Sequence, residues 1–342
     1  MYELIVELVE RGHEVSTFAS GDSDVPGRHI PTVPVALRPA DYKGDSTGFF
    51  LATALAVLDR QDEFDLIHSH LEWTSLLLAK GLHVPLAATF HGRLDLPFAR
   101  DLLGTPTSAN LIAISQSQAS PHPDIDWTIV YNGLTPPSEP FESRRSDALC
   151  FVGRVAPEKG IVEAIEVAKM ADRRLRIAAK IAPSGAEHDY YENEFLPALD
   201  AAGSSVEFLG ELTGPERDEL LAESYAALMP GSWPEPFGLA AIEALACGTP
   251  VLARRVGGLP EIIRDGVDGF FGDDVTEIAF RVPDVEMLDR RAIRESVIQR
   301  FSAKQMADSY EALYRRILGA PADEGRVVDM SVRRSALPPK VG

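Results

Sequence analysis

The chain has 342 residues, which is longer than one ordinary domain, and its 45% hydrophobic and 25% charged residues are typical of a globular protein. The formal net charge of −19 argues against the basic face that binding to nucleic acid or to anionic lipid requires. The two cysteines, Cys150 and Cys247, lie in apolar segments and indicate core packing, not a disulfide framework or a zinc site. We therefore expect no nucleic-acid partner and no stable membrane insertion.

The chain opens with a predicted helix that leads into a strand. Apolar residues occupy one face of residues 1–11, Gly12 ends the helix, and residues 14–20 follow as a strand. This opening carries three glutamates and lacks the basic region and cleavage site of a signal peptide. Together with the unpaired cysteines it leads us to expect a cytoplasmic protein.

Short apolar runs alternate with helical patterns along most of the chain, and such alternation predicts parallel sheets with helical crossovers. In the first half, strands are predicted at 14–20, 29–37, 65–70, 85–91, 110–115 and 127–133, and helices at 51–60 and 73–80. In the second half, strands are predicted at 148–155, 175–181, 205–212, 226–230 and 250–256, and helices at 159–171, 215–226 and 237–247.

A stretch rich in proline and charge, residues 134–147, separates the two alternating series and is predicted to be a linker. The predicted fold class is therefore α/β, with two Rossmann-like doubly wound domains that face a cleft. Ligands of such sheets bind at the carboxyl ends of the strands. The predicted parts are an N-terminal domain (1–140), a C-terminal domain (147–300), a helix that packs back towards the N-terminal domain (301–318) and a disordered tail (320–342).

Two glutamates, Glu235 and Glu243, bracket the start of the helix at 237–247. The first amides of this helix favour an anion such as a phosphate. These amides belong to Phe237, Gly238 and Leu239. Carboxylates beside a phosphate have neutral hydroxyls as their useful partners. The arrangement predicts a sugar nucleotide, with one sugar at Glu235 and the ribose at Glu243.

A second motif, FVGRVAPEKG at 151–160, ends the first strand of the C-terminal domain. Arg154 and Lys159 flank its turn, and two cations so placed complement a diphosphate. The chain has neither a Walker A pattern nor a Gly-x-Gly-x-x-Gly after a strand. A kinase, an ordinary NTPase and a nicotinamide dehydrogenase therefore lose support.

The motifs EPFGLAAIE, GRVAPEKG, VYNGL and GTPVLARRVGGLPEII resemble those of the retaining glycosyltransferases of family 4, which have the GT-B fold. The resemblance extends from Gly12 to about Leu318. It implies a metal-independent, anomer-retaining hexosyltransferase that needs no cofactor. Such an enzyme moves a sugar from a nucleotide-diphosphate donor, expected here to be a UDP-sugar, to a hydroxyl acceptor.

The resemblance also implies roles for individual residues. Arg154 and Lys159 would hold the donor diphosphate, and His91, in TFHG, would reach the donor sugar near the reacting carbon. Glu211 and Leu212 lie where the nucleotide base is usually bound. The expected catalytic residues are His91, Arg154, Lys159 and Glu235. The expected donor-binding residues are Gly153, Arg154, Lys159, Glu211, Leu212, Glu235, Phe237, Gly238, Leu239 and Glu243.

Several alternatives stay open at this stage. The preferred route has the acceptor attack on the face that the diphosphate leaves, and Asp95 is the nearest candidate nucleophile for a covalent route. His68 and His70 alternate at a strand end as a metal pair would, yet no third ligand is evident, so no metal site is expected. A catalytically idle sugar-nucleotide-binding protein is the alternative function.

The start of the chain departs from the family pattern. Members of the family begin with a strand and a glycine-rich loop, whereas this chain begins inside the helix that follows them. That strand is central in a doubly wound sheet, so without it strands 14–20 and 65–70 would lack their shared partner. We therefore expect a functional form to carry roughly 15 to 40 further N-terminal residues.

Overall fold

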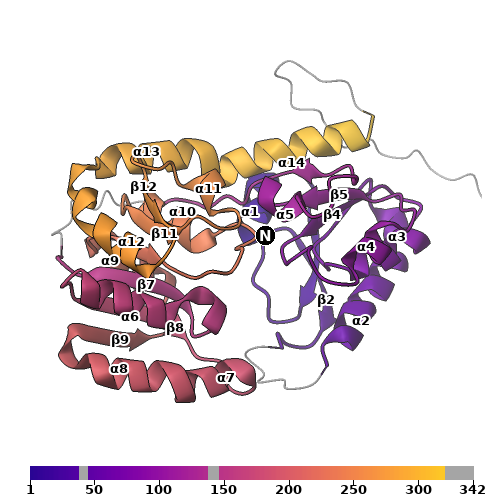
Figure 1. Ribbon diagram of the computed structural model, residues 1–342. Coiled ribbons are helices and arrows are strands. Elements are labelled where there is room, and N and C mark those ends of the chain that lie inside the picture. Colours follow the sequence, from indigo (N-terminus) through magenta and orange to yellow (C-terminus); the bar gives the residue numbers. More distant parts are fainter. Residues whose placement is uncertain (38–44, 138–145, 320–342) are drawn as a thin grey trace, which may run out of the picture.

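A computed structural model describes residues 1–37, 45–137 and 146–319, and it has two halves that are each built on parallel strands (Figure 1). The N-terminal half comprises the elements up to β6, and the C-terminal half runs from β7 to α13. Residues 138–145 of the predicted linker and the predicted tail at 320–342 lie outside the described residues. Within the described ranges, no helix has the length and apolar character that a bilayer span requires.

The strands of the N-terminal half are β1 (Ser16–Ser20), β2 (Arg28–Val33), β3 (Ile67–Ser69), β4 (Leu86–Phe90), β5 (Asn110–Ala113) and β6 (Thr128–Ile129). Its helices are α1 (Tyr2–Glu10), α2 (Thr47–Leu58), α3 (Thr74–Gly81), α4 (Ala99–Leu103) and α5 (Gln116–Ala119). Each predicted strand and helix of this half therefore has an observed counterpart, most of them shorter than predicted.

These strands form two separate parallel sheets, β1-β2 and β3-β4-β5-β6. Among the described residues β1 pairs only with β2, and β3 only with β4, so the strands predicted at 14–20 and 65–70 each lie at a sheet edge. Phe18 of β1 and Ile67 of β3 nevertheless belong to one apolar cluster with residues of α2 and α3. Side-chain packing therefore joins the two sheets where no backbone ladder does.

The C-terminal half contains one six-stranded parallel sheet of order β12-β11-β10-β7-β8-β9. Its strands are β7 (Leu149–Arg154), β8 (Leu175–Lys180), β9 (Val206–Gly210), β10 (Ala227–Met229), β11 (Val251–Arg254) and β12 (Gly269–Gly272). Its helices are α6 (Ile161–Met170), α7 (Ala186–Tyr190), α8 (Leu196–Ala202), α9 (Gly214–Glu223), α10 (Leu239–Ala246), α11 (Leu259–Ile262), α12 (Val275–Arg281) and α13 (Arg290–Phe301).

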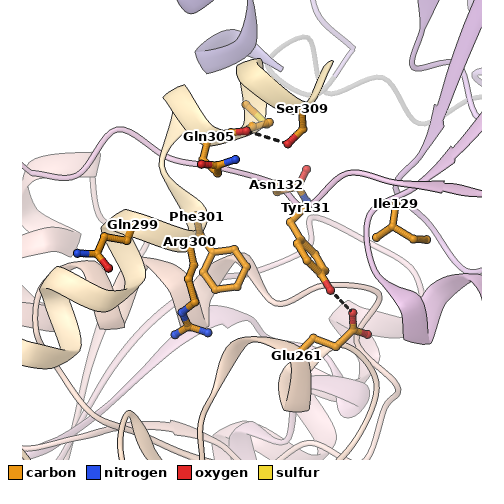
Figure 2. A pocket seen from close by; sticks show the side chains of 10 residues that line it. Ile129, Tyr131, Asn132, Glu261, Gln299, Arg300, Phe301, Gln305 and Ser309 are labelled. Atoms are coloured by element: carbon orange, nitrogen blue, oxygen red, sulfur yellow. Dashed lines mark hydrogen bonds between the residues drawn. The ribbon is translucent and has the colours of Figure 1, made fainter. Parts of the chain in front are cut away.

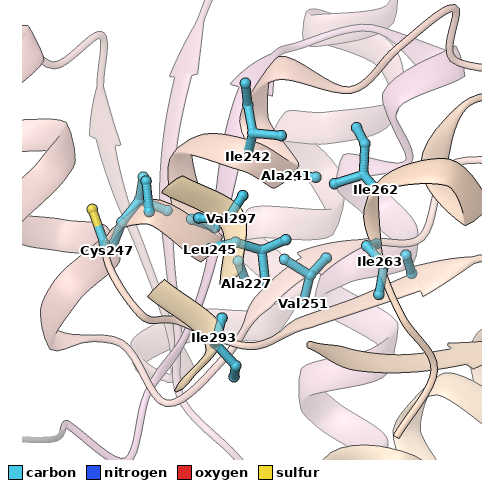
Figure 3. Close-up of a cluster of buried hydrophobic side chains, with 14 of the residues drawn as sticks. Ala227, Ala241, Ile242, Leu245, Cys247, Val251, Ile262, Ile263, Ile293 and Val297 are labelled. Carbon is cyan, nitrogen blue, oxygen red and sulfur yellow. The ribbon is translucent and has the colours of Figure 1, made fainter. Parts of the chain in front are cut away.

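Two apolar clusters pack against this sheet, and Figure 3 shows part of one of them, in which Ile242 and Leu245 of α10 meet Val251 of β11 and helix α13. The other cluster gathers residues of α6, α8 and α12. Both cysteines are buried and free of disulfides, as the sequence predicts. Burial raises the pKa of the Cys150 thiol to about 11 and that of Cys247 to about 12. Both thiols are therefore part of the core.

Helix α14 (Ala303–Ile317) belongs to the core of the N-terminal half although it follows the C-terminal half in sequence. Figure 1 shows this helix, in yellow, leaving α13 and running across to the strands β4 and β5. Its Tyr310 and Leu313 are 2% and 3% exposed and pack with Leu4 and Leu8 of α1. The chain therefore crosses between the halves twice.

Several parts of the structure differ from the sequence expectations, and the short helices α4, α5 and α11 are among the elements that were not predicted. Residues 186–202 form α7, a π-helical turn (Tyr191–Phe195) and α8, where no element was predicted because acidic residues and a proline interrupt the apolar pattern. Strand β12 and helix α12 were also missed. Gly269 begins β12 so close to β11 that a Cβ would lie 1.9 Å from the Val251 carbonyl oxygen, a contact that only glycine permits.

A buried carboxylate organises the approach to β12. Asp268 has no exposed side-chain surface and accepts hydrogen bonds from the Arg264 guanidinium at 2.8 and 2.7 Å and from Arg300 Nη2 at 2.9 Å. A buried charge is tolerated when partners on several sides satisfy it. The loop before β12 therefore depends on this carboxylate.

Replacing Asp268 by Asn should lower the free energy of unfolding by about 3 kcal/mol, because two arginines then lose their shared partner in a buried site. Urea denaturation measures the change. The matched control is Asp284→Asn, which removes a partly exposed ion pair with Arg281 and should cost less than about 1 kcal/mol. Equal effects of the two substitutions would contradict the importance given to burial.

Candidate functional site

Five of the predicted site residues lie where parallel strands of the six-stranded sheet end. Gly153 and Arg154 are the last residues of β7, and Lys159 closes the 3₁₀ turn that follows. Glu211 comes directly after β9, and Glu235 lies in the loop between β10 and α10. Because all these strands run in the same direction, their carboxyl ends share one edge, which is where ligands of such sheets bind.

Lys159 and Glu235 form an ion pair after the two neighbouring strands β7 and β10. The Lys159 Nζ lies 2.9 and 2.6 Å from the two carboxylate oxygens of Glu235. The two loops touch: a Cβ on Gly160, whose φ is 74°, would lie 2.5 Å from the Gly231 nitrogen. Glycine is therefore required at this contact. The sequence assigned the lysine and the glutamate to neighbouring parts of one ligand, and the structure places them in contact with each other.

Arg154 is also paired with carboxylates. Its Nη2 lies 2.9 Å from Glu158 Oε1, and its Nη1 contacts Glu187 Oε1. Glu187 lies on α7, in a segment where the sequence predicted no element, so its contact with the site was missed. Arg154 and Lys159, the two residues predicted to bind the diphosphate, therefore each form an ion pair with a carboxylate in this structure.

The remaining acidic site residues have basic partners that the sequence did not identify. Glu243 of α10 lies 3.1 Å from the Arg217 guanidinium of α9, and burial raises the pKa of the Glu243 carboxyl while this arginine counteracts the rise. Glu211 accepts a hydrogen bond of 2.8 Å from Lys180, the last residue of β8. Leu212 packs against the core. These partners are distant in sequence, so only the fold reveals them.

Helix α10 begins at Leu239, two residues later than predicted. Gly238 has φ of 114°, a left-handed conformation outside the helix, and it forms the N-cap. The Phe237 ring is 1% exposed and packs between Tyr131 and Phe301, so only the backbone of Phe237 is available to a ligand. The backbone groups of the predicted anion site thus lie around the start of α10, and their binding of an anion stays a prediction.

His91 follows β4 directly and is held by two residues that the sequence did not assign to it. Its Nε2 lies 2.9 Å from His70 Nδ1, and its backbone N–H donates to Glu72 Oε1 at 2.9 Å. Glu72 has a positive φ of 48°, which is uncommon for a residue other than glycine and is often found at functional sites. Burial raises the pKa of the Glu72 carboxyl, against the effect of its backbone donors. In the sequence, the alternating pattern His68-x-His70-x-Glu72 could have indicated that His70 and Glu72 lie at the same strand end.

The loops of His91 and Glu235 approach each other across the two halves. The Arg93 guanidinium lies 4.3 Å from the centre of the Trp233 ring, which is a cation–π contact. The Ser115 hydroxyl donates to the Pro236 carbonyl oxygen at 2.5 Å. The residues on either side of Glu235 thus contact the N-terminal half, and the predicted catalytic residues of both halves belong to one region.

The residues considered for alternative chemistry have other partners. His68 contacts the Tyr314 hydroxyl and the Thr89 hydroxyl, each at 2.7 Å. Asp95, the candidate nucleophile, is ion-paired with Arg93, and a hydrogen bond from Arg93 lowers the pKa of its carboxyl. In these contacts His68 is the hydrogen-bond partner of two hydroxyls, and the Asp95 carboxylate is the partner of an arginine.

A cavity of about 310 Å³, lined by none of the predicted site residues, lies where the chain crosses between the halves (Figure 2). Tyr131 and Glu261 line it, and their side chains are joined by a hydrogen bond of 2.9 Å. Arg300 and Phe301, at the end of α13, contribute another part of the wall. This cavity adjoins the contact between the halves and not the carboxyl edge at Arg154 and Lys159.

Comparison with known proteins identifies the family. A profile described as Glycosyltransferase Family 4 matches residues 1–134, and one described as Glycosyl transferases group 1 matches residues 139–286. The chain belongs to this glycosyltransferase family. Over 311 residues the glycosyltransferase is 28% identical to an uncharacterized glycosyltransferase of Methanocaldococcus jannaschii, with 77% of each chain covered.

The glycosyltransferase is also 26% identical over 299 residues to a glycogen synthase of Mycobacterium tuberculosis, covering 75% of this chain and 71% of that protein. Its fold is similar to that of sucrose-phosphate synthase from Thermosynechococcus elongatus, with a TM-score of 0.73, 20% identity and coverage of 93% and 92%. The HepE protein of Anabaena gives a TM-score of 0.68 at 20% identity, with 92% and 96% covered. These structures confirm the GT-B fold of the glycosyltransferase.

The histidines of the site predict how stability depends on pH. Burial is the main cause that lowers the pKa of His91 to about 4 and that of His68 to about 3. The unfolded chain takes up these protons near pH 6.5, whereas the folded chain does not. The free energy of unfolding that these two histidines contribute should therefore be fully present above pH 6.5 and should decrease progressively as the pH falls towards 4.

Urea denaturation between pH 8 and pH 4.5 tests this expectation. His91→Asn removes one of the buried groups, so the free energy of unfolding of this variant should fall less steeply than that of the wild type below pH 6.5. If His91→Asn keeps the wild-type slope, then His91 titrates in the folded chain as it does in the unfolded one.

Proposed function

We propose that this glycosyltransferase is a retaining, metal-independent enzyme that transfers a sugar from a UDP-sugar to a hydroxyl acceptor. The observation that carries the proposal is the group formed by Arg154, Lys159 and Glu235 at the carboxyl edge of the sheet, next to the loop of His91. The enzyme would act in the cytoplasm.

The site offers complementary groups to each part of such a donor. Arg154 and Lys159 would bind the diphosphate and stabilise the negative charge that grows as it leaves. The backbone amides at the start of α10 would bind the distal phosphate. Glu235 would accept hydrogen bonds from the transferred sugar, and Glu243 from the ribose.

The carboxylates that pair with the cations affect how the donor enters. Glu235 already holds the Lys159 ammonium. The lysine would therefore bridge the Glu235 carboxylate and the diphosphate, and it would keep its orientation when the donor binds. Arg154 is 43% exposed and would exchange its contact with Glu187 for one with a phosphate. A cation that is already oriented loses less conformational entropy when the donor binds.

The donor and the stereochemistry are supported by different observations. Solved structures of the Anabaena HepE protein hold UDP and UDP-glucose, and this chain has a similar fold. Asp95, the candidate nucleophile of a covalent route, is held by the Arg93 guanidinium. Attack by the acceptor on the face that the diphosphate leaves is therefore the preferred route, with retention of the anomeric configuration.

Metal dependence and stereochemistry can be measured together. Transfer from a UDP-sugar should continue in EDTA, because two cations and a helix start already meet the diphosphate charge. The product should keep the donor's anomeric configuration in NMR spectra. Activity that is lost in EDTA and restored by Mn²⁺, or a product with inverted anomeric configuration, would contradict this mechanism.

The diphosphate ligands are tested by substitution. Arg154→Ala and Lys159→Ala should each lower kcat by about 10²-fold or more, because their charge acts mainly in the transition state. Glu243→Ala should mainly raise the donor KM. Arg291→Ala, which alters a side chain that is 87% exposed, is the control. Wild-type turnover in both Arg154→Ala and Lys159→Ala would show that the donor site is assigned wrongly.

A further inference from the structure

Glu261 joins the two halves through three hydrogen bonds. Its carboxylate accepts the backbone N–H groups of Gln116 at 2.9 Å and Ser117 at 2.7 Å, which belong to the start of α5 in the N-terminal half. It also accepts the Tyr131 hydroxyl at 2.9 Å, a contact that Figure 2 shows at the cavity between the halves. One side chain of the C-terminal half thus caps a helix of the N-terminal half.

On the C-terminal side, Glu261 is tied to the loop that carries Glu235. The backbone N–H of Gly258, three residues before Glu261, donates to the Glu235 carbonyl oxygen at 2.7 Å. A Cβ on Gly257 would lie 2.3 Å from the same oxygen, so the two segments are in direct backbone contact. Ile262 is fully buried and anchors α11 in the core. The position of Glu261 is therefore fixed relative to Glu235.

On the N-terminal side, α5 is tied to the backbone on both sides of His91. The Gln118 side chain, 5% exposed, donates to the carbonyl oxygens of Phe90 at 3.0 Å and Gly92 at 2.7 Å. These two residues flank His91. Hydrogen bonds therefore connect the Glu235 loop with the His91 backbone through α11, Glu261, α5 and Gln118.

We propose that Glu261 is a positioning residue that sets the orientation of His91 relative to the Glu235 loop by holding the two halves together. The inference rests on the proposed function, in which His91 and Glu235 act on the same donor sugar. Among the described residues, the Glu261 side chain contacts neither Arg154, Lys159 nor Glu235. Its effect on the site would therefore come from the relative position of the two halves.

The charge of Glu261 is essential to this role. A carboxylate accepts two backbone N–H groups at once, and such charge-assisted hydrogen bonds are stronger than neutral ones. Glutamine has nearly the same shape but has one acceptor and one donor. In Glu261→Gln, one backbone N–H of α5 would face an amide N–H, and that contact between the halves would be lost. Tyr131→Phe is milder, because it removes one bond and leaves both backbone bonds in place.

The first readout is kinetic. Glu261→Gln should lower kcat about tenfold, because a small displacement of reacting groups has a large effect on rate, and should leave the donor KM within about twofold of the wild type. Tyr131→Phe should have a smaller effect on kcat. The matched control is Glu277→Gln, which alters a carboxylate that accepts the Asp273 N–H within the C-terminal half.

The second readout is the arrangement of the halves and does not require activity. Spin labels at Asp62→Cys and Asp147→Cys, whose native side chains are 83% and 95% exposed, report the distance between the halves by pulsed electron resonance. The native cysteines are buried and should label slowly. Glu261→Gln should broaden the distance distribution, and Glu277→Gln should leave it unchanged.

The combined outcomes separate this inference from the proposed function. An unchanged distance distribution in Glu261→Gln overturns the inference, and so does a raised donor KM with unchanged kcat, which would place Glu261 in donor binding. If the wild type transfers no sugar, the proposed function fails, while the distance measurement still decides whether Glu261 holds the halves together.

Discussion

The backbone contact between Gly160 and Gly231 is the constraint on which the site depends. It brings the loops after the neighbouring strands β7 and β10 so close that Lys159 and Glu235 form an ion pair. On the far side of the same loop, the buried ring of Phe237 fixes the start of α10. A side chain at either glycine would separate the loops and with them the charges. The chemistry of the site is therefore determined by backbone packing before any ligand is present.

The electrostatics of the site follow from the strongly acidic composition of the chain. Arg154, Lys159, Lys180 and Arg217 each have a carboxylate partner at or near the carboxyl edge. A ligand with phosphate groups therefore replaces one anionic partner by another and does not meet bare positive charge. Such a site keeps its cations oriented and discriminates against anions that cannot also satisfy the carboxylates, because unpaired charges that lose water are costly.

The sequence predicted the parts of the fold that local patterns of residues specify. Apolar periodicity identified the strands and most of the helices, and glycines and prolines placed the loops that carry Arg154 and Glu235. It did not identify Glu187, Arg217 or Glu261, because their partners are 33, 26 and about 145 residues away and are chosen by the packing of the sheet. Strand β12 was missed because it begins and ends with glycine, which leaves only two apolar residues in its pattern.

The return of α14 to the N-terminal half has a consequence for synthesis. Domains generally fold in order from the N-terminus as the ribosome produces them, at about 5 to 20 residues per second. Here the apolar cluster that includes Leu4 and Leu8 is completed by Tyr310 and Leu313, so this cluster stays open until almost all of the described chain has been made. The six-stranded sheet of the C-terminal half needs no residue beyond β12 for its ladder. The half that is translated first thus has the apolar cluster that is completed last, and during translation it exposes apolar surface for longer.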